Sequence, residues 1–398
     1  MTSARPRIAD AQRRARVAAR LHLGRTAAGV GPAVRSVVAL HSSDPITPHL
    51  ALWARVPGYQ TAHLDEALCG TRTLWRTHAM RRTLFVVPSA EREVFDGAAS
   101  RAVARKERQR LEAGLERAMG PSAAPDWLGA VEQRTLDALR ATPERSASQL
   151  AALVPELATT VTLGSGKWAA AVPLSSRLLI LLAMEGRAVR TRPAGSWRSS
   201  QYRWAAADQW LPATPGPMEE SEARAHLLRG YLGAYGPATL TDVRWWTGWT
   251  AGQAKAALEA VAAVPVELDA PAEGWVLPAD VESVAAERPT VALLPGLDPA
   301  AMGWKQRDWY LGAHGERLYD RNGNAGPSIW VDGRIVGAWA QRPTGEVVTG
   351  LVEAIGQQAR RSVDAEAAAL TAWLGGTVVS SRFPAPLEQQ LSATGPSD

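Results

Sequence analysis

The order of the predicted elements is the feature of this chain that most limits its possible folds. Two stretches share one order, in which three short helices precede two short strands. In the first stretch we expect helices over 127–139, 146–154 and 174–185, and strands near 188–190 and 202–204. In the second we expect helices over 221–235, 241–247 and 250–261, and strands near 264–268 and 275–277. The N-caps expected for these helices are Ser146, Thr241 and Thr250.

Three helices followed by a hairpin are the order of a winged helix-turn-helix unit, whose third helix can enter the major groove of DNA. Winged helices also serve as packing modules alone, and that alternative stays open for each copy. We predict a mainly α fold with α+β modules. Its divisions are expected to be three winged-helix units over 1–120, 125–215 and 220–288, and a β-rich, barrel-like domain over 289–398.

Local signals support these boundaries. The run Gly-Pro-Ser-Ala-Ala-Pro at 120–125 breaks the chain after a long charged helix expected from about residue 90 to 119. From residue 289 the chain changes to short apolar segments, and Asp332-Gly333 is a two-residue hairpin signal. The other expected elements are an arginine-rich helix over 6–23, a buried strand over 83–87, strands at 291–294, 328–331 and 335–339, a helical tail over 346–374 and a strand-like 377–379.

A polar segment, His41-Ser42-Ser43-Asp44-Pro45, interrupts the first unit and is called the knot below. We expect an apolar helix to end at His41 and a second helix to start at Thr47-Pro48. If the knot is extended, His41 and Ser43 point the same way and present two uncharged hydrogen-bonding groups. The residues alone leave a simpler interpretation open, in which Asp44 caps a turn and His41 is a core histidine.

Three strings in the chain resemble a known family. They are LHSSDPITPHLALWARVPGY at the knot, MRRTLFVVP after it, and RDWYLGAHGERLYDRNGNAGPSIWVDGRIVGAWAQR from Arg307 to Arg342. These strings are similar to the winged-helix DNA-binding proteins that include the AlkZ-type bacterial DNA glycosylases. The resemblance runs from about residue 8 to residue 342. It implies a DNA glycosylase that acts on double-stranded DNA containing alkylated purines.

In characterised glycosylases of that family the knot reads Gln-x-Gln or Gln-x-Asp. The matching positions in this sequence are His41 and Ser43. The resemblance therefore implies catalytic roles for His41 and Ser43, in which His41 orients water and Ser43 fixes water or contacts the sugar. Asp44, the carboxylate of the knot, would orient His41 or stabilise the cation. The alternative is a non-catalytic winged-helix DNA-binding protein or regulator, in which the changed knot records lost chemistry.

The implied reaction suits side chains of this kind. Alkylation at purine N7 or N3 makes the base cationic, so the leaving group needs no protonation. The enzyme must then stabilise an oxocarbenium-like sugar and position water, which is largely positioning and electrostatics. An imidazole and a hydroxyl are sufficient for this work. A serine-hydrolase interpretation is poor, because His41 and Ser43 are only two residues apart and no nucleophile elbow is present.

The positive charge is concentrated near the N-terminus. Residues 1–120 hold 20 Lys and Arg against 10 Asp and Glu, whereas the whole chain holds 44 against 39. Such a segment attracts polyanions, and arginine matches phosphate geometry. We expect Arg81 or Arg82 to contact DNA phosphate, with pairing to a carboxylate as the alternative. The arginines over 101–117 fit a solvated face equally well.

Two loops are further candidates for DNA binding. Lys167 and Trp168 follow Gly164-Ser165-Gly166, and a cation beside an aromatic suits an element that probes a strand. Arg321 and Asn322 open a glycine-rich segment that could lie against DNA backbone. A loop anchored by one tryptophan and a plain turn are the respective alternatives.

The amino-acid composition excludes several other classes of protein. One cysteine, Cys69, rules out an intramolecular disulfide framework and a cysteine-rich zinc site, and the seven histidines lack ligand spacing. We therefore expect no metal, and the absence of a phosphate-binding loop leads us to expect no cofactor. No run of 18 apolar residues and no leader are present, so we expect a soluble, cytoplasmic monomer.

Overall fold

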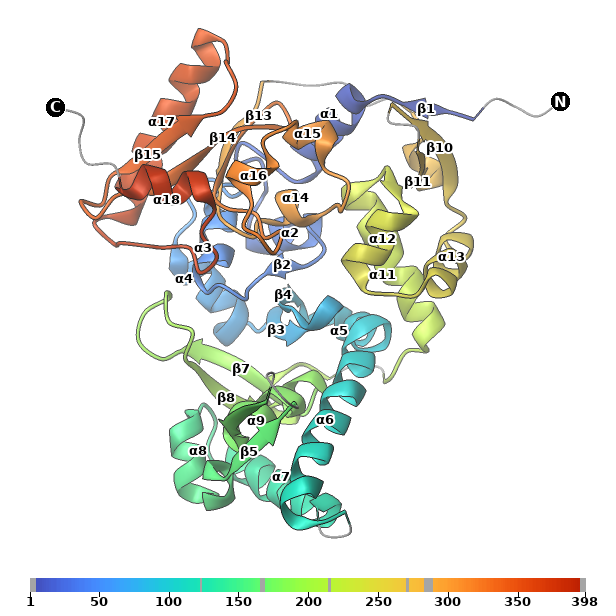
Figure 1. The fold of residues 1–398 in the computed structure, drawn as a ribbon, viewed down its shortest axis with the longest axis vertical. Coiled ribbons are helices and arrows are strands. Elements are labelled where there is room, and N and C mark those ends of the chain that lie inside the picture. The colour runs from blue at the N-terminus through green and yellow to red at the C-terminus, as the bar shows by residue number, and fades with distance from the viewer. Residues whose placement is uncertain are drawn as a thin grey trace. The chain divides into compact units, whose positions relative to one another are not determined.

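The computed structural model describes residues 5–121, 124–164, 169–213, 216–269, 272–282 and 289–393. The chain forms two compact units (Figure 1). Unit 1 combines Met1–His63 with Ala225–Asp398, and unit 2 is Leu64–Arg224. The fold mixes helices, which hold about half of the residues, with several sheets. The border at residues 63 and 64 does not coincide with the expected one at 120, and the finer four-part division stays a prediction.

Unit 2 contains the first predicted set of three helices and two strands. Its helices are α7 (Ala124–Ala141), α8 (Ala147–Leu153) and α9 (Leu174–Met184), and its strands are β7 (Ala188–Pro193) and β8 (Tyr202–Ala206). Ser146 caps α8 as expected and forms a capping box with Gln149. A hydrophobic cluster of the unit includes apolar side chains from these helices and strands, with Leu111 and Leu115 from α6 (Arg101–Met119).

The charged helix expected from residue 90 to 119 is present as a continuous helical run from Arg92 to Met119, with a π-helical turn inside it. α5 (Arg92–Phe95) passes into a π-helical turn, Asp96–Ser100, before α6 begins. Helix α5 follows a 3-10 turn, Ser89–Glu91. Gly97 lies inside the π-helical turn, where a Cβ atom would approach the Ala223 side chain to 2.7 Å. The local widening and the missing side chain therefore allow close packing at this point.

Four strands of unit 2 form an antiparallel arrangement. Their order is β4 (Leu84–Pro88), β3 (Leu74–His78), β7 and β8. Every residue of β3 and β4 is buried, which confirms the buried strand expected over 83–87. A separate hairpin of β5 (Thr160–Leu163) and β6 (Ala170–Pro173) was not predicted from the sequence.

The second predicted set of helices and strands contributes to unit 1. Its elements are α11 (Glu220–Tyr235), which begins in unit 2, β9 (Ala238–Thr239), α12 (Leu240–Thr247), α13 (Ala251–Ala260), β10 (Val264–Leu268) and β11 (Glu273–Val276). Thr250 caps α13 as expected, but Thr239 rather than Thr241 caps α12, because Asp242 completes a capping box with Thr239. The elements occur in the predicted order, and their assignment as winged helices stays a prediction.

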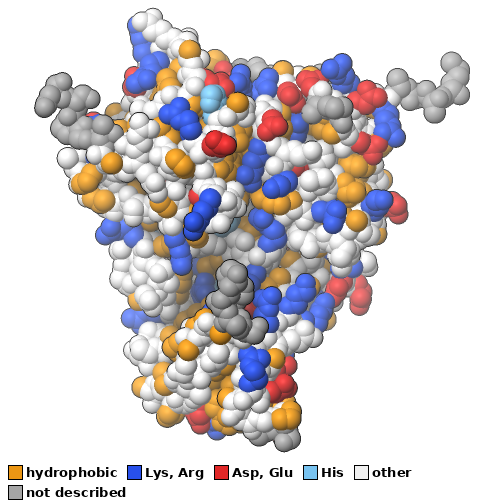
Figure 2. All heavy atoms as spheres, in the orientation of Figure 1, with side chains coloured by type: hydrophobic (Ala, Val, Ile, Leu, Met, Phe, Trp, Pro, Cys, Tyr) orange, Lys and Arg blue, Asp and Glu red, His pale blue; other side chains and the backbone are white. Residues whose placement is uncertain are grey.

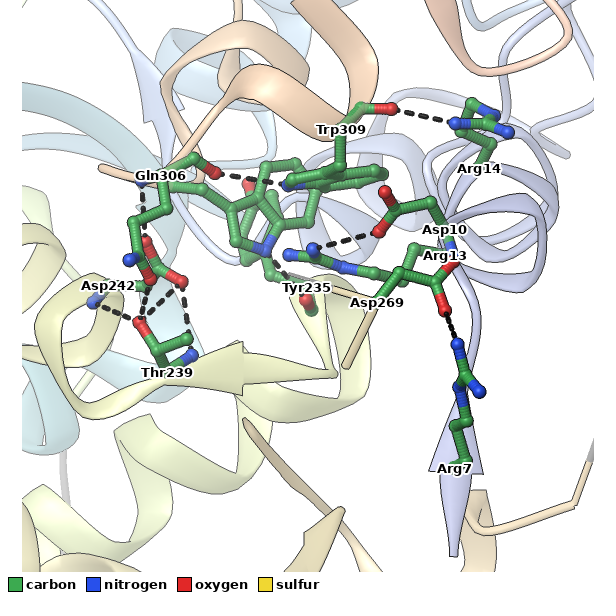
Figure 3. Close-up of polar contacts among 11 residues, drawn as sticks. Arg7, Asp10, Arg13, Arg14, Tyr235, Thr239, Asp242, Asp269, Gln306 and Trp309 are labelled. Carbon is green, nitrogen blue, oxygen red and sulfur yellow. Dashed lines mark hydrogen bonds and ion pairs between the residues drawn. The ribbon is translucent and has the colours of Figure 1, made fainter. Parts of the chain in front are cut away.

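Asp242 also joins α12 to a distant loop (Figure 3). Its carboxylate accepts hydrogen bonds from the amides of Lys305 and Gln306, each at 2.9 Å, and from the amide of Thr239 at 3.0 Å. Three backbone donors satisfy a carboxylate that is fully buried. The same figure shows the Arg13 guanidinium over the Trp309 ring, 4.0 Å from its centroid. These contacts hold the 304–309 segment against the N-terminal part of unit 1.

The N-terminal segment differs from the helix expected over 6–23. Arg7–Ile8 form β1, which pairs in parallel with β10, and helix α1 begins only at Asp10 and ends at Arg20. The free edge of β10 recruits this segment, since edge strands offer unpaired backbone groups. None of the helices in the described part of the chain combines the length and hydropathy needed to cross a bilayer.

The C-terminal β-rich part is an open sheet and was wrongly expected to be barrel-like. Its antiparallel order is β12 (Val291–Leu294), β13 (Ser328–Val331), β14 (Arg334–Gln341) and β15 (Val347–Leu351). In the described residues β12 and β15 are edges, and four strands are too few to close a barrel around side chains. The short helices α14 (Pro299–Met302), α15 (Asp308–Leu311) and α16 (Gly315–Leu318) lie between β12 and β13.

The tail also differs in part from its expected structure. Residues 347–351 form β15 instead of helix, and the helical part is α17 (Gln357–Leu374), which packs on the sheet (Figure 1). Residues 377–379 form no strand, and α18 (Pro386–Ala393) follows. The predicted hairpin is confirmed, because Asp332 and Gly333, both with positive φ, connect β13 to β14.

Candidate active site and nucleic-acid interface

The knot lies in unit 1 between two short helices. The helix expected to end at His41 is α2 (Val30–Ser36), which ends earlier because Val38 takes a left-handed conformation with φ of 63°. Leu40–His41 then form the short strand β2. Helix α3 (Ile46–Trp53) starts one residue before the expected position, and Thr47 lies inside it. The Thr47 hydroxyl does not cap the helix but donates to the Gly296 carbonyl at 2.8 Å.

The knot is largely withdrawn from solvent. His41 is 8% exposed, Ser42 and Asp44 are also buried, and Ser43 is half-buried. Ser42 Oγ makes no hydrogen bond to any residue that the structure describes. A run of polar residues with this burial is costly unless its groups are paired or used. The expected catalytic residues His41 and Ser43 therefore stand in a sheltered position, and their roles stay a proposal.

The Asp44 carboxylate is held by backbone amides. It accepts from the Ile46 amide at 3.2 Å, which is the turn interaction left open by the sequence, and from the Arg382 amide at 2.8 Å. The Arg382 guanidinium donates to the Ser43 carbonyl at 3.2 Å. Both oxygens of Asp44 are thus engaged, and a segment more than three hundred residues away contacts the knot at two points.

Glu388, on α18, is a second buried carboxylate beside the knot. It accepts from the Ala385 amide at 3.2 Å and from Ser381. A cavity of about 10 Å³, room for roughly one water molecule, is lined by both carboxylates and, among others, by Thr47, Gly296, Gln341 and Ser381. We call residues 379–393, which carry these contacts, the C-terminal strap.

Burial shifts the proton affinity of both carboxyl groups. It raises the pKa of Glu388 to about 7, against the opposing effect of hydrogen bonds from Ser381 and Ala385, and the negative charge of Asp44 adds to the increase. Burial also raises the pKa of Asp44, which the amides of Arg382 and Ile46 partly offset. Each of the two acids therefore keeps its proton up to a higher pH than an isolated carboxyl group would.

The end of α3 is fixed by a buried ion pair. Two nitrogens of the Arg55 guanidinium donate to the two oxygens of Asp298, each at 2.8 Å, and both side chains are buried. One of these nitrogens also donates to the Ala51 carbonyl. Such a bidentate pair is strongly directional. It positions α3, and with it the knot, relative to the segment that leads into α14.

Unit 2 holds the two arginines expected to contact phosphate. Arg81 and Arg82 both adopt positive φ, 53° and 64°, in the turn between β3 and β4. Both are exposed, and Arg82 forms an ion pair with Glu107 at 3.4 Å. The carboxylate pairing that the sequence left open for this pair is therefore present at Arg82. Contact of either residue with phosphate stays a proposal.

Arg82 also lines a cavity of about 530 Å³ in unit 2. Arg110, Arg117 and Arg177 line it as well, with Glu107 as the acidic residue, and leucine and isoleucine side chains complete the wall. Figure 2 shows several Lys and Arg side chains (blue) exposed on the lower part of the visible face, where unit 2 is drawn. A basic cavity with apolar walls suits a sugar-phosphate chain.

The two loops predicted to bind DNA have different outcomes. Lys167 and Trp168 lie outside the described residues; their neighbours Leu163, Gly164 and Ala170 line the basic cavity. Arg321 and Asn322 are exposed in a turn of unit 1. The plain-turn alternative accounts for that segment, because the Asp320 carboxylate accepts from the amides of Asn322 and Asn324 at 2.8 Å.

Sequence reasoning missed several residues at these sites. Arg382 and Glu388 carry no motif, and only the folded chain brings them to the knot. Arg110 and Arg117 were noted as part of a basic run without a function, and Arg177 was not singled out. In the part of the chain that the structure describes, no three His, Cys, Asp or Glu side chains are grouped as metal ligands would be. Metal independence itself stays a prediction.

Comparisons with known proteins agree with this arrangement. The family model for AlkZ-like DNA glycosylases matches residues 34–373. Among solved structures, Streptomyces sahachiroi DNA glycosylase AlkZ is similar with a TM-score of 0.71 and 19% sequence identity, over 95% of this chain and 99% of that one. At this identity the likeness shows a shared fold. No curated protein sequence is significantly similar to the chain. Because the family model spans well over half of its residues, this protein belongs to the AlkZ-like DNA glycosylase family.

Proposed function

We propose that this glycosylase is monofunctional and removes bulky or cationic N-alkylated purines, such as N7-alkylguanine and N3-alkyladenine, from double-stranded DNA. The observation that carries the proposal is the sheltered His41-x-Ser43 pair, whose neighbour Asp44 is engaged by two backbone amides. An imidazole and a hydroxyl in this position can orient a water molecule, and neither needs to form a covalent bond with the sugar. The family membership supplies the DNA substrate.

The proposed reaction uses the charge of the lesion. The bond from the sugar C1′ to the alkylated nitrogen breaks with both electrons moving to the cationic base, which leaves neutral. A water molecule then adds to C1′ of the oxocarbenium-like sugar, and its proton passes to His41 or to solvent. His41 orients and partly deprotonates this water, and Ser43 fixes the water or contacts the deoxyribose. A genotoxic natural product attached at purine N7 or N3 makes the base cationic in the same way and fits the same chemistry. Such a substrate would make the enzyme a self-resistance factor, and simpler alkylpurines would make it a base excision repair enzyme.

Asp44 is assigned a positioning role within this proposal. Its carboxylate bonds the start of α3 and the C-terminal strap, so its first effect is on the shape of the knot. Its charge nevertheless lies beside Ser43 and favours a developing sugar cation. Catalytic involvement of Asp44 is therefore electrostatic in the proposal, with no bond made to it.

The lysine content supports the monofunctional assignment. Enzymes that also cleave the strand use an amine to form a covalent bond with the sugar. The chain has four lysines, at 106, 167, 255 and 305, and none lies in the knot or in the strap. Water is accordingly the nucleophile in the proposed mechanism.

The proposal assigns DNA binding to three sets of residues. Arg81, Arg82 and the other arginines of the basic cavity would contact phosphate, and Lys167 and Trp168 would probe the strand. Arg321 and Asn322 are retained as backbone contacts on the strength of their exposure. The winged-helix assignment, a monomeric state and a cytoplasmic location complete the proposal.

A base-release assay tests this function. Duplex DNA alkylated at guanine N7 is incubated with excess enzyme, and the free base is quantified. The wild-type chain is expected to release N7-alkylguanine, and His41→Ala is expected to lose release while it retains most of its affinity for DNA. Release by His41→Ala at the wild-type rate would remove the knot from the mechanism. DNA binding without release by the wild type would favour the non-catalytic alternative.

A further inference from the structure

Two arginines of unit 2 stand directly opposite each other on neighbouring strands. Arg76 of β3 pairs in register with Arg190 of β7, so both side chains project to the same face. Arg76 is 4% exposed and Arg190 is half-buried. Like charges at directly opposed positions destabilise a sheet. A stable fold that keeps this pair requires something else to compensate for the charge.

Aromatic rings hold both guanidinium groups without neutralising them. The guanidinium carbons of Arg76 and Arg190 lie 4.9 and 5.7 Å from the centroid of the Tyr202 ring, and that of Arg190 lies 5.1 Å from the ring of Trp204. A ring face attracts a cation and restricts its orientation. Both groups are therefore held near one ring with their charges intact.

The pair has few protein partners. One nitrogen of Arg76 donates to the Thr191 carbonyl at 2.9 Å, whereas the Nε atoms of Arg76 and Arg190 have no acceptor among the described residues. Neither arginine forms an ion pair with a described carboxylate, although Asp65 is near enough for Arg76 to lower its pKa against a larger increase from burial. Burial and the charge of Arg76 lower the pKa of Arg190 to about 10. These facts describe a site with excess positive charge.

A neighbour on the same strand provides the contrast. Arg192, two residues after Arg190 on β7, forms an ion pair with Glu144 at 3.2 Å. The fold thus supplies a carboxylate to one arginine of this strand and leaves the other without one. Arg190 and Tyr202 are each half-buried, so part of this pair and its ring reaches the surface of unit 2.

A histidine on the same face lies within the field of Arg190, one member of this pair, and of Arg82. His78 follows Arg76 by two residues on β3 and so projects to the same side. Burial and the positive charges of Arg190 and Arg82 hold its pKa well below the ordinary value. Arg82 in turn lines the basic cavity. The opposed pair and the cavity therefore belong to one positively charged region.

We propose that Arg76 and Arg190 form a phosphate site that binds one backbone phosphodiester of the DNA strand. Two planar guanidinium groups offer parallel N–H donors that match the non-bridging oxygens of phosphate. The anion would relieve the repulsion between the two cations and accept hydrogen bonds from their guanidinium groups. The inference rests on the proposed function, which identifies the polyanion as DNA. It adds to that function a site on unit 2 that fixes the register of the bound DNA strand.

Salt dependence of DNA binding tests the site in the full-length chain. The dissociation constant for an undamaged duplex oligonucleotide is measured against salt concentration for the wild type, Arg190→Gln and Arg76→Gln. Each substitution is expected to lower the slope of log affinity against log salt by about 1, the value for one lost phosphate contact. Arg192→Gln, whose cation is already paired, is expected to keep the wild-type slope. Arg190→Lys retains the charge and is expected to keep the slope but bind more weakly, because the bidentate contact is lost.

Thermal unfolding in phosphate buffer tests whether the site binds free phosphate as well as the phosphate groups of DNA. Replacing chloride with inorganic phosphate at constant ionic strength is expected to raise the unfolding temperature of the wild type and Arg192→Gln more than that of Arg190→Gln. Stabilisation by phosphate without any change of salt slope would overturn the assignment to DNA. An unchanged slope in folded Arg190→Gln, together with equal stabilisation of this variant and the wild type by phosphate, would overturn the site entirely. Arg190→Gln is sufficient for this test if Arg76→Gln does not fold.

These outcomes are distinct from those for catalysis. Reduced slopes in a chain that releases no base would support the phosphate site and reject the glycosylase specificity. Base release by the wild type with unchanged slopes in both variants would reject the phosphate site alone.

Discussion

The amide of Arg382 donates to the Asp44 carboxylate at 2.8 Å and so joins the C-terminal strap to the knot. The two residues are 338 positions apart. The family model ends at residue 373, so the strap lies beyond the matched segment. The shape of the candidate active site in this chain therefore depends on residues outside that segment, and the predictions below begin from this contact.

Removing the strap's amide donor should loosen the knot. Arg382→Pro deletes the N–H that bonds Asp44, and we expect a loss of about 2 kcal/mol of stability, typical of a hydrogen bond to a charged group. Arg382→Ala keeps the amide and should cost under about 1 kcal/mol. Denaturant unfolding measures both, and base release in the proline variant should fall more than DNA affinity does. Equal stabilities for the two variants would show that the amide contact is not important.

Glu388 should make the protein less stable as pH rises. Its pKa is raised from 4.5 to about 7 in the folded chain, so the native state favours the protonated acid. Its contribution is complete below about pH 4.5 and is lost as pH rises to 7, by an amount on the order of 3 kcal/mol. Glu388→Gln mimics the protonated acid and should flatten this part of the profile. Chemical denaturation at several pH values measures the change.

A control variant distinguishes the effect of the Glu388 proton on stability from the effect of removing any one negative charge. Glu346, which is exposed and paired with Arg342, offers a matched Glu→Gln substitution outside the strap. Glu346→Gln should retain the wild-type decline between pH 4.5 and 7. Because burial also raises the pKa of Asp44, a smaller decline in the same direction should survive in Glu388→Gln. A wild-type decline in Glu388→Gln would assign the pH dependence to other groups.

Substitutions in the knot should have graded effects on excision. His41→Ala should lower the single-turnover rate by about a hundredfold or more, the usual contribution of a positioned general base. Ser43→Ala should be milder, about tenfold, since a second water can replace a hydroxyl that only positions water. His41→Gln should retain more activity than His41→Ala, because an amide can also hold water. A larger loss for Ser43→Ala than for His41→Ala would reverse the proposed roles.

Arg81 and Arg82 should contribute to phosphate binding. Arg→Ala at one of the two positions is expected to weaken binding to all sequences and to reduce the salt slope by about one counterion. The Arg82–Glu107 ion pair predicts the smaller effect at Arg82, because its charge is partly compensated. Arg134→Ala, which breaks a surface pair with Glu156, is a suitable control. Unchanged slopes in both variants would reject phosphate contact at this turn and leave Arg82 with its ion pair to Glu107.

Excision should depend on the charge of the lesion and not on a metal ion. We expect release of N7- or N3-alkylpurines to continue in excess EDTA, because the proposed mechanism uses only side chains and water. Neutral lesions such as uracil should be poor substrates, since they lack an activated leaving group. Parallel assays on methylated and uracil-containing duplexes measure the preference. Activity that disappears with EDTA and returns with zinc or magnesium would overturn the mechanism.

Much of the local structure was predictable from the sequence. Ser146 and Thr250 cap the expected helices, and Asp332-Gly333 forms the expected hairpin. These features depend on neighbours within about four residues, whose preferences are present in the local sequence. The wrongly predicted elements are those in which a strand from another part of the sequence pairs with the segment. The N-terminal helix is shorter because β1 pairs with β10, and Val347–Leu351 is a strand because β14 offers a partner.

For the candidate site, too, some features follow from the local sequence and others from long-range folding. The sequence by itself determined the family resemblance and the chemical character of His41 and Ser43, because residue types and their spacing carry both. Only the tertiary structure decided which groups surround them, since Arg382 and Glu388 carry no motif and reach the knot through long-range folding. The opposed pair of Arg76 and Arg190 likewise exists only through strand register. Burial, charge compensation and proton affinity are properties of the packed chain, and sequence spacing alone does not specify them.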